Sequence, residues 1–215
     1  LSPKLHNYWL KKNKVVAVYE KEQLDEGHLE NFIMRIRNNE ICGANVTVPF
    51  KKKIISFLDK LTPEAQNTQS VNTVYLERDK IIGHNTDISG FELSIRETGY
   101  NVSGKKILIL GAGGVAPSII YALYKMKATN IMLSNRTKIM AENLKILFNN
   151  LDVINWGEIP DFDMIINATS IGLKEKDEFD FNLSKLNGGD FFYDVIYNPN
   201  ETKFLKNARQ LGKKT

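Results

Sequence analysis

Apolar and polar residues follow one pattern before residue 86 of the chain and a different one from residue 105 onward. In the first part, the apolar run Val15–Tyr19 predicts a short buried strand, and apolar residues at helical spacing between Leu29 and Ile36 predict a helix. The stretch Gly43–Val48 returns to strand chemistry and is stopped by Pro49, which has no N–H to give to a ladder. These elements predict a unit that mixes helices and strands.

Two more elements are predicted in the first part. Apolar residues at positions 54, 55 and 58 indicate a helix, and Val71–Ile82 indicates two strands around the polar turn Glu77–Lys80. The pattern changes across residues 86–104. We therefore predict two domains, residues 1–88 and residues 89–215.

The second part repeats strand and helix. Ile107–Leu110 is a continuous apolar run of the kind found in central parallel strands, and helices are predicted over about Gly114–Lys127 and Lys138–Phe148. Further strands are predicted at Asn130–Leu133, Asp152–Asn155, Met164–Ala168 and Phe191–Val195. This alternation predicts a doubly wound parallel sheet with right-handed crossovers. The fold class is thus α/β, with an N-terminal α/β domain joined to a Rossmann-like domain.

The composition is that of a globular protein: 42% of the 215 residues are hydrophobic and 25% are charged. No apolar run is long enough to span a bilayer and no basic-then-apolar leader opens the chain, so we expect a cytoplasmic protein without a membrane partner. The single cysteine, Cys42, excludes an internal disulfide, and we expect it to be a small buried residue. His6, His28 and His84 lie far apart, so no metal site is expected.

The net charge of +4 raises the question of a nucleic-acid partner. The lysines are scattered among acids, and the short runs Lys51–Lys53 and Lys213–Lys214 carry no aromatic-rich pattern. An anionic small substrate explains the excess equally well, so no nucleic-acid binding is expected.

A glycine-rich turn follows the buried strand at 107–110 and opens a predicted helix. Glycines allow a tight turn and let backbone N–H groups approach a pyrophosphate at the positive end of the helix, so the turn predicts a dinucleotide site. The alternative is a tight strand–helix connection without a ligand. The residues of this turn are Gly111, Ala112, Gly113, Gly114, Val115 and Ala116.

The end of the next predicted strand indicates which dinucleotide is bound. NAD sites usually place an acidic residue there, whereas this chain has Asn135, Arg136 and Thr137 and no acid. Arg136 offers a planar fork to a 2′-phosphate, and Lys138 adds charge nearby. NADP is therefore favoured, the alternative being that Arg136 is a surface arginine that caps the turn.

Three polar clusters in the first part do not look like core. They are Ser2–Asn7, Asn45–Lys51, and Asn72-Thr73 together with Asn85–Asp87. Their amides, hydroxyls, ammonium and carboxylate suit a polyhydroxylated carboxylate ligand. Each cluster alone is explained equally by turns or by the start of a basic helix face.

At these clusters the chain resembles the shikimate dehydrogenase family. Motifs S-P-x-x-H-N, N-V-T-x-P-x-K, V-N-T and N-T-D-x-x-G-F are matched in order, and so are motifs of the second domain. The matching segments are Ser2–Asn7, Asn45–Lys51, Val71–Thr73, Asn85–Phe91, Gly111–Ala116, Asn135–Thr137, Asn167–Gly172 and Asp194–Pro199.

The resemblance implies a two-domain enzyme with its active site between the domains, which reversibly reduces 3-dehydroshikimate to shikimate with NADPH in aromatic amino-acid (chorismate) biosynthesis. It assigns Lys51 and Asp87 to catalysis, and it places Thr169 and Ser170 in a loop that faces the cofactor. It assigns substrate binding to Ser2, Asn45, Thr47, Asn72 and Tyr197. A ketone that receives hydride gains negative charge on oxygen, and Lys51, held by Asp87, would deliver the proton.

Four features depart from the family pattern. Members have a strand and an additional serine before Ser2, and they continue past the final helix to a substrate-binding glutamine. If these 215 residues were the whole protein, the first domain would lack its opening strand and closing helix. Gln69-Ser70 replace the usual Gly-Ala, and Met140 stands where a second phosphate-binding arginine is frequent.

Three other functions compete with this interpretation. A quinate/shikimate dehydrogenase paralogue, often NAD-preferring, is disfavoured by the missing acid after the second strand. Glutamyl-tRNA reductase would need an N-terminal cysteine nucleophile. A non-catalytic ligand sensor would not need both Lys51 and Asp87. The oligomeric state is left open, and a homodimer is compatible with the sequence.

Overall fold

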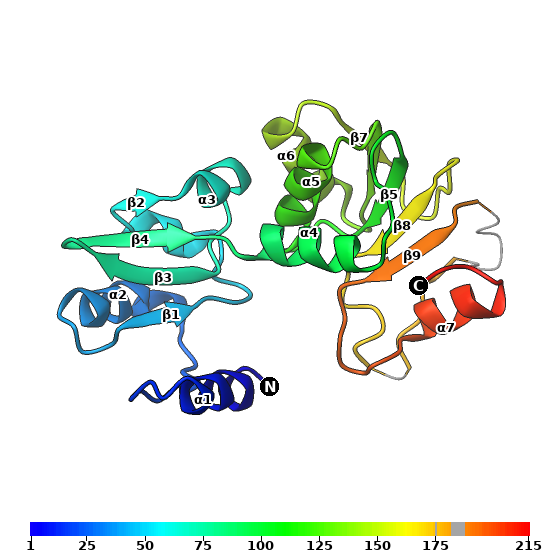
Figure 1. Cartoon of the computed structure of the whole chain (residues 1–215). Helices are drawn as coiled ribbons and strands as arrows, with labels where there is room; N and C mark the ends of the chain where they lie inside the picture. Colours follow the sequence, from blue (N-terminus) through cyan, green and yellow to red (C-terminus); the bar gives the residue numbers. More distant parts are fainter. Residues whose placement is uncertain (175, 182–187) are drawn as a thin grey trace.

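Two β-sheets organise the computed structural model, which describes residues 1–174, 176–181 and 188–215 (Figure 1). One sheet has four strands and is formed by the first part of the chain; the other has five and is formed by the second part. They lie in two bodies joined through α4 (Asp87–Glu97), as Figure 1 shows. The predicted α/β fold with a mixed first domain and a Rossmann-like second domain is confirmed.

The first sheet has the order β1-β3-β4-β2. Its strands are β1 (Gly43–Asn45), β2 (Lys60–Leu61), β3 (Thr73–Glu77) and β4 (Lys80–His84). β3 and β4 form the predicted hairpin, in which Arg78 and Asp79 both adopt positive φ, as a two-residue turn that matches the twist of the strands requires. β2 runs parallel to β4, while β1 is antiparallel to β3.

The helices and 3₁₀ turns of the first part are α1 (Ser2–Lys12), η1 (Glu26–His28), α2 (Leu29–Arg37), η2 (Lys53–Phe57) and α3 (Pro63–Thr68). The predicted helical spacing is confirmed in α2, which buries Leu29, Ile33 and Ile36 against the sheet. α1 buries none of its side chains.

The second sheet is parallel throughout, with the order β7-β6-β5-β8-β9. Its strands are β5 (Lys106–Leu110), β6 (Asn130–Ser134), β7 (Leu151–Ile154), β8 (Met164–Asn167) and β9 (Phe191–Asp194). The helices of this part are α4, α5 (Ala116–Lys125), α6 (Lys138–Leu147) and α7 (Lys203–Gln210). The strand order reverses beside β5, where such sheets bind ligands at the carboxyl ends of their strands.

Both faces of this sheet are buried, which explains the continuous apolar run of β5. Ile107 and Ile109 pack in one core with α4, α5 and α6, while Leu108 and Leu110 pack in the opposite core with α7. The loops at the carboxyl ends of these strands therefore emerge from a layer that is packed on both faces.

The predicted buried strand at Val15–Tyr19 is wrong. The segment forms no strand, and Val16 and Val18 are exposed. Among the described residues no strand lies beside it to complete a ladder. Instead, the side chain of Asn7 pairs with Tyr19, its Nδ2 donating to the carbonyl at 2.8 Å and its Oδ1 accepting the N–H at 2.9 Å. An apolar run becomes a strand only where a partner satisfies its backbone.

The expectation for Cys42 is also wrong, because its side chain is exposed. It lies in the bend before β1, which is an edge strand with little cover. The strand predicted at Gly43–Val48 ends at Asn45, although the N–H of Val46 still donates to the carbonyl of Asn72 at 2.8 Å. None of the helices in the described part of the chain is long and apolar enough to cross a bilayer.

Asp163 ties the starts of three strands of the second sheet together and makes stability depend on pH. Its carboxylate accepts the N–H of Lys106 at 2.8 Å, which lowers the pKa of Asp163, and Lys105 at 3.3 Å adds to this. A depressed carboxyl pKa stabilises the fold above the unfolded value near 4 and loses that contribution as pH falls through the folded value.

We therefore expect Asp163→Asn to lower the free energy of unfolding at about pH 7 by about 0.5 kcal/mol, since solvent screens a side chain that is 33% exposed. The difference should shrink at about pH 3, because the carboxyl of the unfolded chain is then mostly protonated. Urea unfolding at both pH values measures it. Asp161→Asn is the control, because Asp161 is 80% exposed and should change stability little at either pH. An equal loss at both pH values would show that the charge is not responsible.

Candidate active site

A cleft of about 1000 Å³ lies between the two parts of the chain. The first part contributes Thr47, Val48 and Lys51 to its lining, and the glycine-rich turn of the second part faces them. A Cβ built on Gly114 would lie 3.9 Å from Cδ of Lys51, so the lysine stem rests against this turn. Residues that are far apart in sequence therefore form one site.

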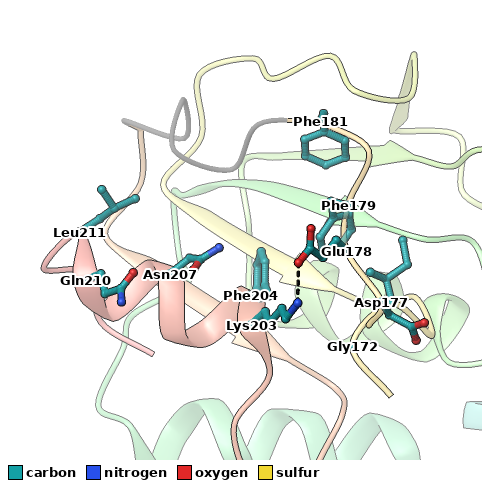
Figure 2. Close-up of a pocket in the computed structure, with 11 residues that line it drawn as sticks. Gly172, Asp177, Glu178, Phe179, Phe181, Lys203, Phe204, Asn207, Gln210 and Leu211 are labelled. Atoms are coloured by element: carbon teal, nitrogen blue, oxygen red, sulfur yellow. Dashed lines mark hydrogen bonds and ion pairs between the residues drawn. The ribbon is translucent and has the colours of Figure 1, made fainter. Parts of the chain in front are cut away.

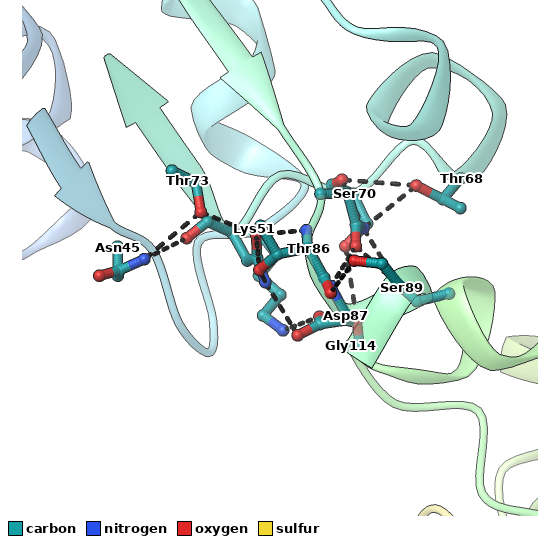
Figure 3. A network of polar contacts seen from close by, with 12 residues as sticks. Asn45, Lys51, Thr68, Ser70, Thr73, Thr86, Asp87, Ser89 and Gly114 are labelled. Carbon is teal, nitrogen blue, oxygen red and sulfur yellow. Dashed lines mark hydrogen bonds and ion pairs between the residues drawn. The ribbon is translucent and has the colours of Figure 1, made fainter. Parts of the chain in front are cut away.

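Lys51 and Asp87 form an ion pair in this region. The Lys51 Nζ lies 2.6 Å from Asp87 Oδ2, and their side chains are 15% and 24% exposed (Figure 3). Asp87 is the first residue of α4, where the helix N-terminus favours a carboxylate. Lys51 follows the cis Val48–Pro49 bond, and its carbonyl accepts the N–H of Val71 at 2.8 Å. The backbone thus places an ammonium group in a partly desolvated position beside a fixed carboxylate.

Asn72 holds the carboxylate from the other side. Its Nδ2 donates to Asp87 Oδ1 at 2.8 Å and to Thr86 Oγ1 at 2.9 Å, while its Oδ1 accepts the N–H of Thr86 at 3.0 Å. Asn72 is only 9% exposed. Both oxygens of Asp87 are therefore engaged, which fixes the carboxylate and through it the ammonium group of Lys51.

Asn45 extends this polar network towards the start of the chain. Its Nδ2 donates to Thr73 Oγ1 at 3.3 Å, and its Oδ1 accepts the hydroxyl of Tyr19 at 2.9 Å. Burial raises the pKa of Tyr19, so its hydroxyl stays a donor near neutral pH. The ring of His6 stacks on Tyr19 with centroids 4.2 Å apart.

The glycine-rich turn has the geometry of a phosphate-binding loop. Gly111 has a φ of +106°, and a Cβ there would meet Thr169 Cγ2 at 2.8 Å and the Ala168 carbonyl at 2.9 Å. Among the described residues, no acceptor is found for the N–H groups of Gly113, Gly114 and Val115. These groups precede α5, so they suit an anionic phosphate at its N-terminus.

Asn135 joins this loop to the end of β6. Its Oδ1 accepts the N–H of Ala112 at 2.9 Å, and its Nδ2 donates to the Thr137 carbonyl at 2.8 Å. Arg136 lines the cleft and has no ion-pair partner in the part of the chain that the structure describes. Lys138 does not line the cleft, and its Nζ donates to Asn155 Oδ1 at 3.0 Å.

The ends of β8 and β9 carry a second buried network. Asn167 Nδ2 donates to Asp194 Oδ2 at 3.1 Å, and Asn167 Oδ1 accepts the Thr169 hydroxyl at 2.7 Å. Burial raises the pKa of Asp194, although hydrogen bonds from Thr202, Ile196 and Asn167 oppose this. The network positions the loop at Thr169 and Ser170, which lines the cleft.

A smaller hollow of about 420 Å³ adjoins the cleft between α7 and residues 177–181 (Figure 2). Aromatic side chains of Phe179, Phe181 and Phe204 line it, and Lys203 pairs with Glu178 across it. It shares Ile171, Asp177 and Glu178 with the cleft. None of the residues predicted for the site lines this hollow, so the sequence gives it no role.

The ion pair of Lys51 and Asp87 opposite the glycine-rich turn suits proton transfer to or from a substrate oxygen beside a dinucleotide.

Comparisons with known proteins support this interpretation of the cleft. Residues 1–74 match the family model of the shikimate dehydrogenase substrate binding domain, and residues 92–174 match that of shikimate / quinate 5-dehydrogenase. The shikimate dehydrogenase (NADP(+)) of Pelagibacter ubique is 59% identical over 212 residues, which cover 99% of this chain and 80% of that protein. The chain belongs to the shikimate dehydrogenase family.

Solved structures of the family share the fold. The shikimate dehydrogenase of Aquifex aeolicus matches with a TM-score of 0.91 and 38% identity over 100% of this chain and 80% of that one. The shikimate 5-dehydrogenase of Thermus thermophilus, solved in complex with NADP(H) and shikimate, matches with a TM-score of 0.87 and 27% identity over 99% and 80%. The resemblance to the shikimate dehydrogenase family predicted from sequence is confirmed.

The structure brings most of the residues predicted for a shikimate dehydrogenase site to the cleft. Those that line it are Thr47, Lys51, Gly111, Ala112, Gly113, Gly114, Val115, Asn135, Arg136, Thr169, Ser170 and Tyr197. Asn45, Asn72 and Asp87 lie in the polar network beside Lys51 rather than on the cleft surface. Ser2 is exposed at the start of α1, and it is Leu1 that lines the cleft. Ala116, Thr137 and Lys138 stand outside the lining.

Several lining residues were not predicted. They are Leu1, Val48, Met140, Trp156, Ala168, Ile171, Leu173, Asp177, Glu178, Asp180, Val195, Ile196 and Asn198. Trp156 donates its Nε1–H to Asp180 Oδ1 at 2.7 Å, a contact across 24 positions that no local pattern reveals. Among the described residues no group of three or more His, Cys, Asp or Glu could hold a metal ion.

Proposed function

We propose that this chain catalyses the reversible reduction of 3-dehydroshikimate to shikimate with NADPH, a step of aromatic amino-acid biosynthesis, and that Lys51 and Asp87 are its catalytic pair. The observation that carries the proposal is the ion pair of 2.6 Å between them, at a cleft whose other wall is the phosphate-binding loop. Membership of the shikimate dehydrogenase family supports the substrate, and the geometry of the ion pair supports the proposed roles of Lys51 and Asp87.

NADPH, when bound, supplies the hydride. As the substrate ketone becomes an alcohol, negative charge develops on its oxygen, and a donor within hydrogen-bond reach lowers that barrier. Lys51 stabilises the oxygen and transfers a proton from Nζ to it, and in the oxidation it accepts that proton. Asp87 holds the Lys51 Nζ in place. Because Asn72 also binds Asp87, the carboxylate itself stays fixed.

The remaining polar groups bind substrate in this proposal. Thr47 offers a hydroxyl on the first wall, and Tyr197 lies on the second. Asn45 and Asn72 stand in the polar network beside Lys51, and we assign them to the substrate groups next to that network. We assign Ser2 to the same set, although its neighbour Leu1 lines the cleft and Ser2 does not. We assign the first domain to residues 1–88 and the NADP-binding domain to residues 89–215. A cytoplasmic location and the absence of a nucleic-acid partner remain predictions, and the oligomeric state stays open, a homodimer being compatible with the sequence.

The absorbance of NADPH followed with 3-dehydroshikimate tests this function. We expect oxidation with 3-dehydroshikimate and NADPH, and much slower oxidation with NADH or with dehydroquinate. Equal rates with NADH and dehydroquinate would favour a quinate/shikimate dehydrogenase, and shikimate binding without turnover would favour a ligand sensor. Either result would refute the proposal.

Arg136→Ala is expected to raise the KM for NADPH by about 10- to 100-fold and to leave the KM for NADH nearly unchanged. The reason is that a bidentate guanidinium–phosphate contact is worth about 1.5–3 kcal/mol and that only NADPH carries the 2′-phosphate. Steady-state kinetics with both cofactors measures it. Arg96→Ala, on the exposed side of α4, is the control. Equal losses with both cofactors would contradict the role of Arg136.

A further inference from the structure

Asn85 is a buried amide at the junction of the two domains, 1% exposed, between the end of β4 and the start of α4. Its Nδ2 donates to the Ser70 carbonyl at 2.8 Å and to the Ser118 hydroxyl oxygen at 2.9 Å, with Thr68 Oγ1 at 3.3 Å. Ser70 and Thr68 belong to the first domain, whereas Ser118 belongs to α5 of the second. One side chain therefore links both domains.

The carbonyl oxygen of the same amide holds the catalytic carboxylate's backbone. Asn85 Oδ1 accepts the N–H of Asp87 at 3.0 Å, and the Ser118 hydroxyl also approaches it at 3.3 Å. Ser118 is fully buried. The start of α4, which presents Asp87 to Lys51, is thus held by an amide whose other end is held by α5.

The partner helix α5 begins directly after the phosphate-binding loop, and Ser118 is its third residue. A second contact joins the same parts, since Ser70 Oγ lies 3.5 Å from the Gly114 carbonyl. Figure 3 shows Ser70 between Thr68 and Gly114 in this network. The path from the loop to Asp87 passes through two side chains, Ser118 and Asn85.

We propose that Asn85 and Ser118 are positioning residues, which couple the cofactor-binding helix α5 to the catalytic carboxylate of Asp87. This inference rests on the proposed function for its kinetic consequence. Its structural part does not depend on turnover. A phosphate bound at Gly113–Val115 fixes the start of α5 and Ser118 with it, and Asn85, held by Ser118, fixes the N–H of Asp87.

The chemistry of the amide explains why this link is stiff. Both hydrogens and the oxygen of Asn85 are engaged inside a buried junction, and a buried polar group that loses its partner costs free energy. Asn85 therefore cannot rotate without leaving a donor or acceptor unpaired. A displacement of Asp87 by a fraction of an ångström would in turn shift Lys51 from the position that proton transfer needs.

Ser118→Ala tests the coupling with little change in volume. We expect kcat to fall about tenfold while the KM values for NADPH and 3-dehydroshikimate stay within about twofold, because binding groups are untouched. With NADPH deuterated at the transferred position, the isotope effect on kcat should rise, since chemistry becomes slower. Ser118→Thr, which keeps the hydroxyl, should recover most of kcat.

Ser94→Ala is the matched control. Ser94 lies on α4, where its hydroxyl donates to the Phe91 carbonyl at 2.8 Å and lies 2.9 Å from the Tyr193 hydroxyl, but it does not contact Asn85. It should lower thermal stability about as much as Ser118→Ala and leave kcat and the isotope effect unchanged. If both variants lose only stability, or lose kcat equally, the positioning role is refuted.

A measurement that needs no turnover separates this inference from the proposed function. In the unmodified chain, adding NADP⁺ should shift the NMR signals of the Asp87 backbone amide and the Asn85 side-chain amide, and in Ser118→Ala the Asp87 shift should be largely lost. A shift of equal size in both proteins, or no shift in the unmodified chain, overturns the coupling even if the chain reduces 3-dehydroshikimate. Conversely, if the Asp87 shift is lost in Ser118→Ala, the coupling is supported even when the chain shows no turnover.

Discussion

Lys51→Ala is expected to lower kcat by about 10³-fold and to raise the KM for 3-dehydroshikimate far less. A positioned general acid contributes about 10²- to 10⁴-fold, and alanine leaves no proton donor at this place on the cleft wall. Substrate binding falls less because Asn45, Thr47 and Tyr197 remain. Steady-state kinetics with 3-dehydroshikimate and NADPH separates the two quantities.

Lys52→Ala is the control for this prediction. Lys52 is the next residue, is exposed and does not line the cleft, so its loss changes the charge of the segment without touching the site. Its kcat should stay within about twofold of the unmodified chain. Near-normal turnover by Lys51→Ala, or an equal loss in both variants, would remove Lys51 from the mechanism.

Gly111→Ala is expected to lower the free energy of unfolding by about 3 kcal/mol and to abolish tight NADPH binding. A Cβ at this position has no room, because Thr169 Cγ2 would lie 2.8 Å away and the backbone of Ala168 2.9 Å away, and the φ of +106° is strained for any side chain. Relief of these contacts must move the phosphate-binding loop. Thermal unfolding and NADPH titration by fluorescence measure the two effects.

Gly113→Ala separates crowding at Gly111 from a general effect of alanine in the loop. The nearest atom to a Cβ at 113 is the Ala168 carbonyl oxygen at 3.8 Å, an ordinary contact, and its φ is not in the left-handed region. Its free energy of unfolding should change by less than about 1 kcal/mol. If Gly111→Ala is as stable as Gly113→Ala and binds NADPH as well, the loop geometry described above is wrong.

The second domain could be predicted closely from sequence because its strands are buried on both faces. Ile107–Leu110 is apolar at every position, and the structure shows alternate residues packing in opposite cores. Val15–Tyr19 has the same apolar character and failed as a strand, since hydrophobicity alone does not supply a neighbouring strand. The prediction for Cys42 failed for a related reason. Its exposure depends on what covers the edge strand β1, and the local sequence pattern does not contain that information.

The candidate site was predictable where chemistry lies in short motifs and not where it depends on contacts between domains. Lys51 and Asp87 stand 36 positions apart, and only the resemblance of the surrounding motifs joined them before the structure showed their ion pair. No sequence motif indicates the contact of Asn85 with Ser118, because the sequence around Ser118 predicts only a helix. The side of α5 that faces the first domain is decided by packing.

The transfer of deuterium from NADPH, labelled at the transferred position, to 3-dehydroshikimate tests the central claim most directly. Mass spectrometry of the product should show shikimate carrying one deuterium, formed in step with NADPH loss by the unmodified chain and about 10³-fold more slowly by Lys51→Ala. Product without label, no product at all, or equal rates in the two proteins would contradict the account.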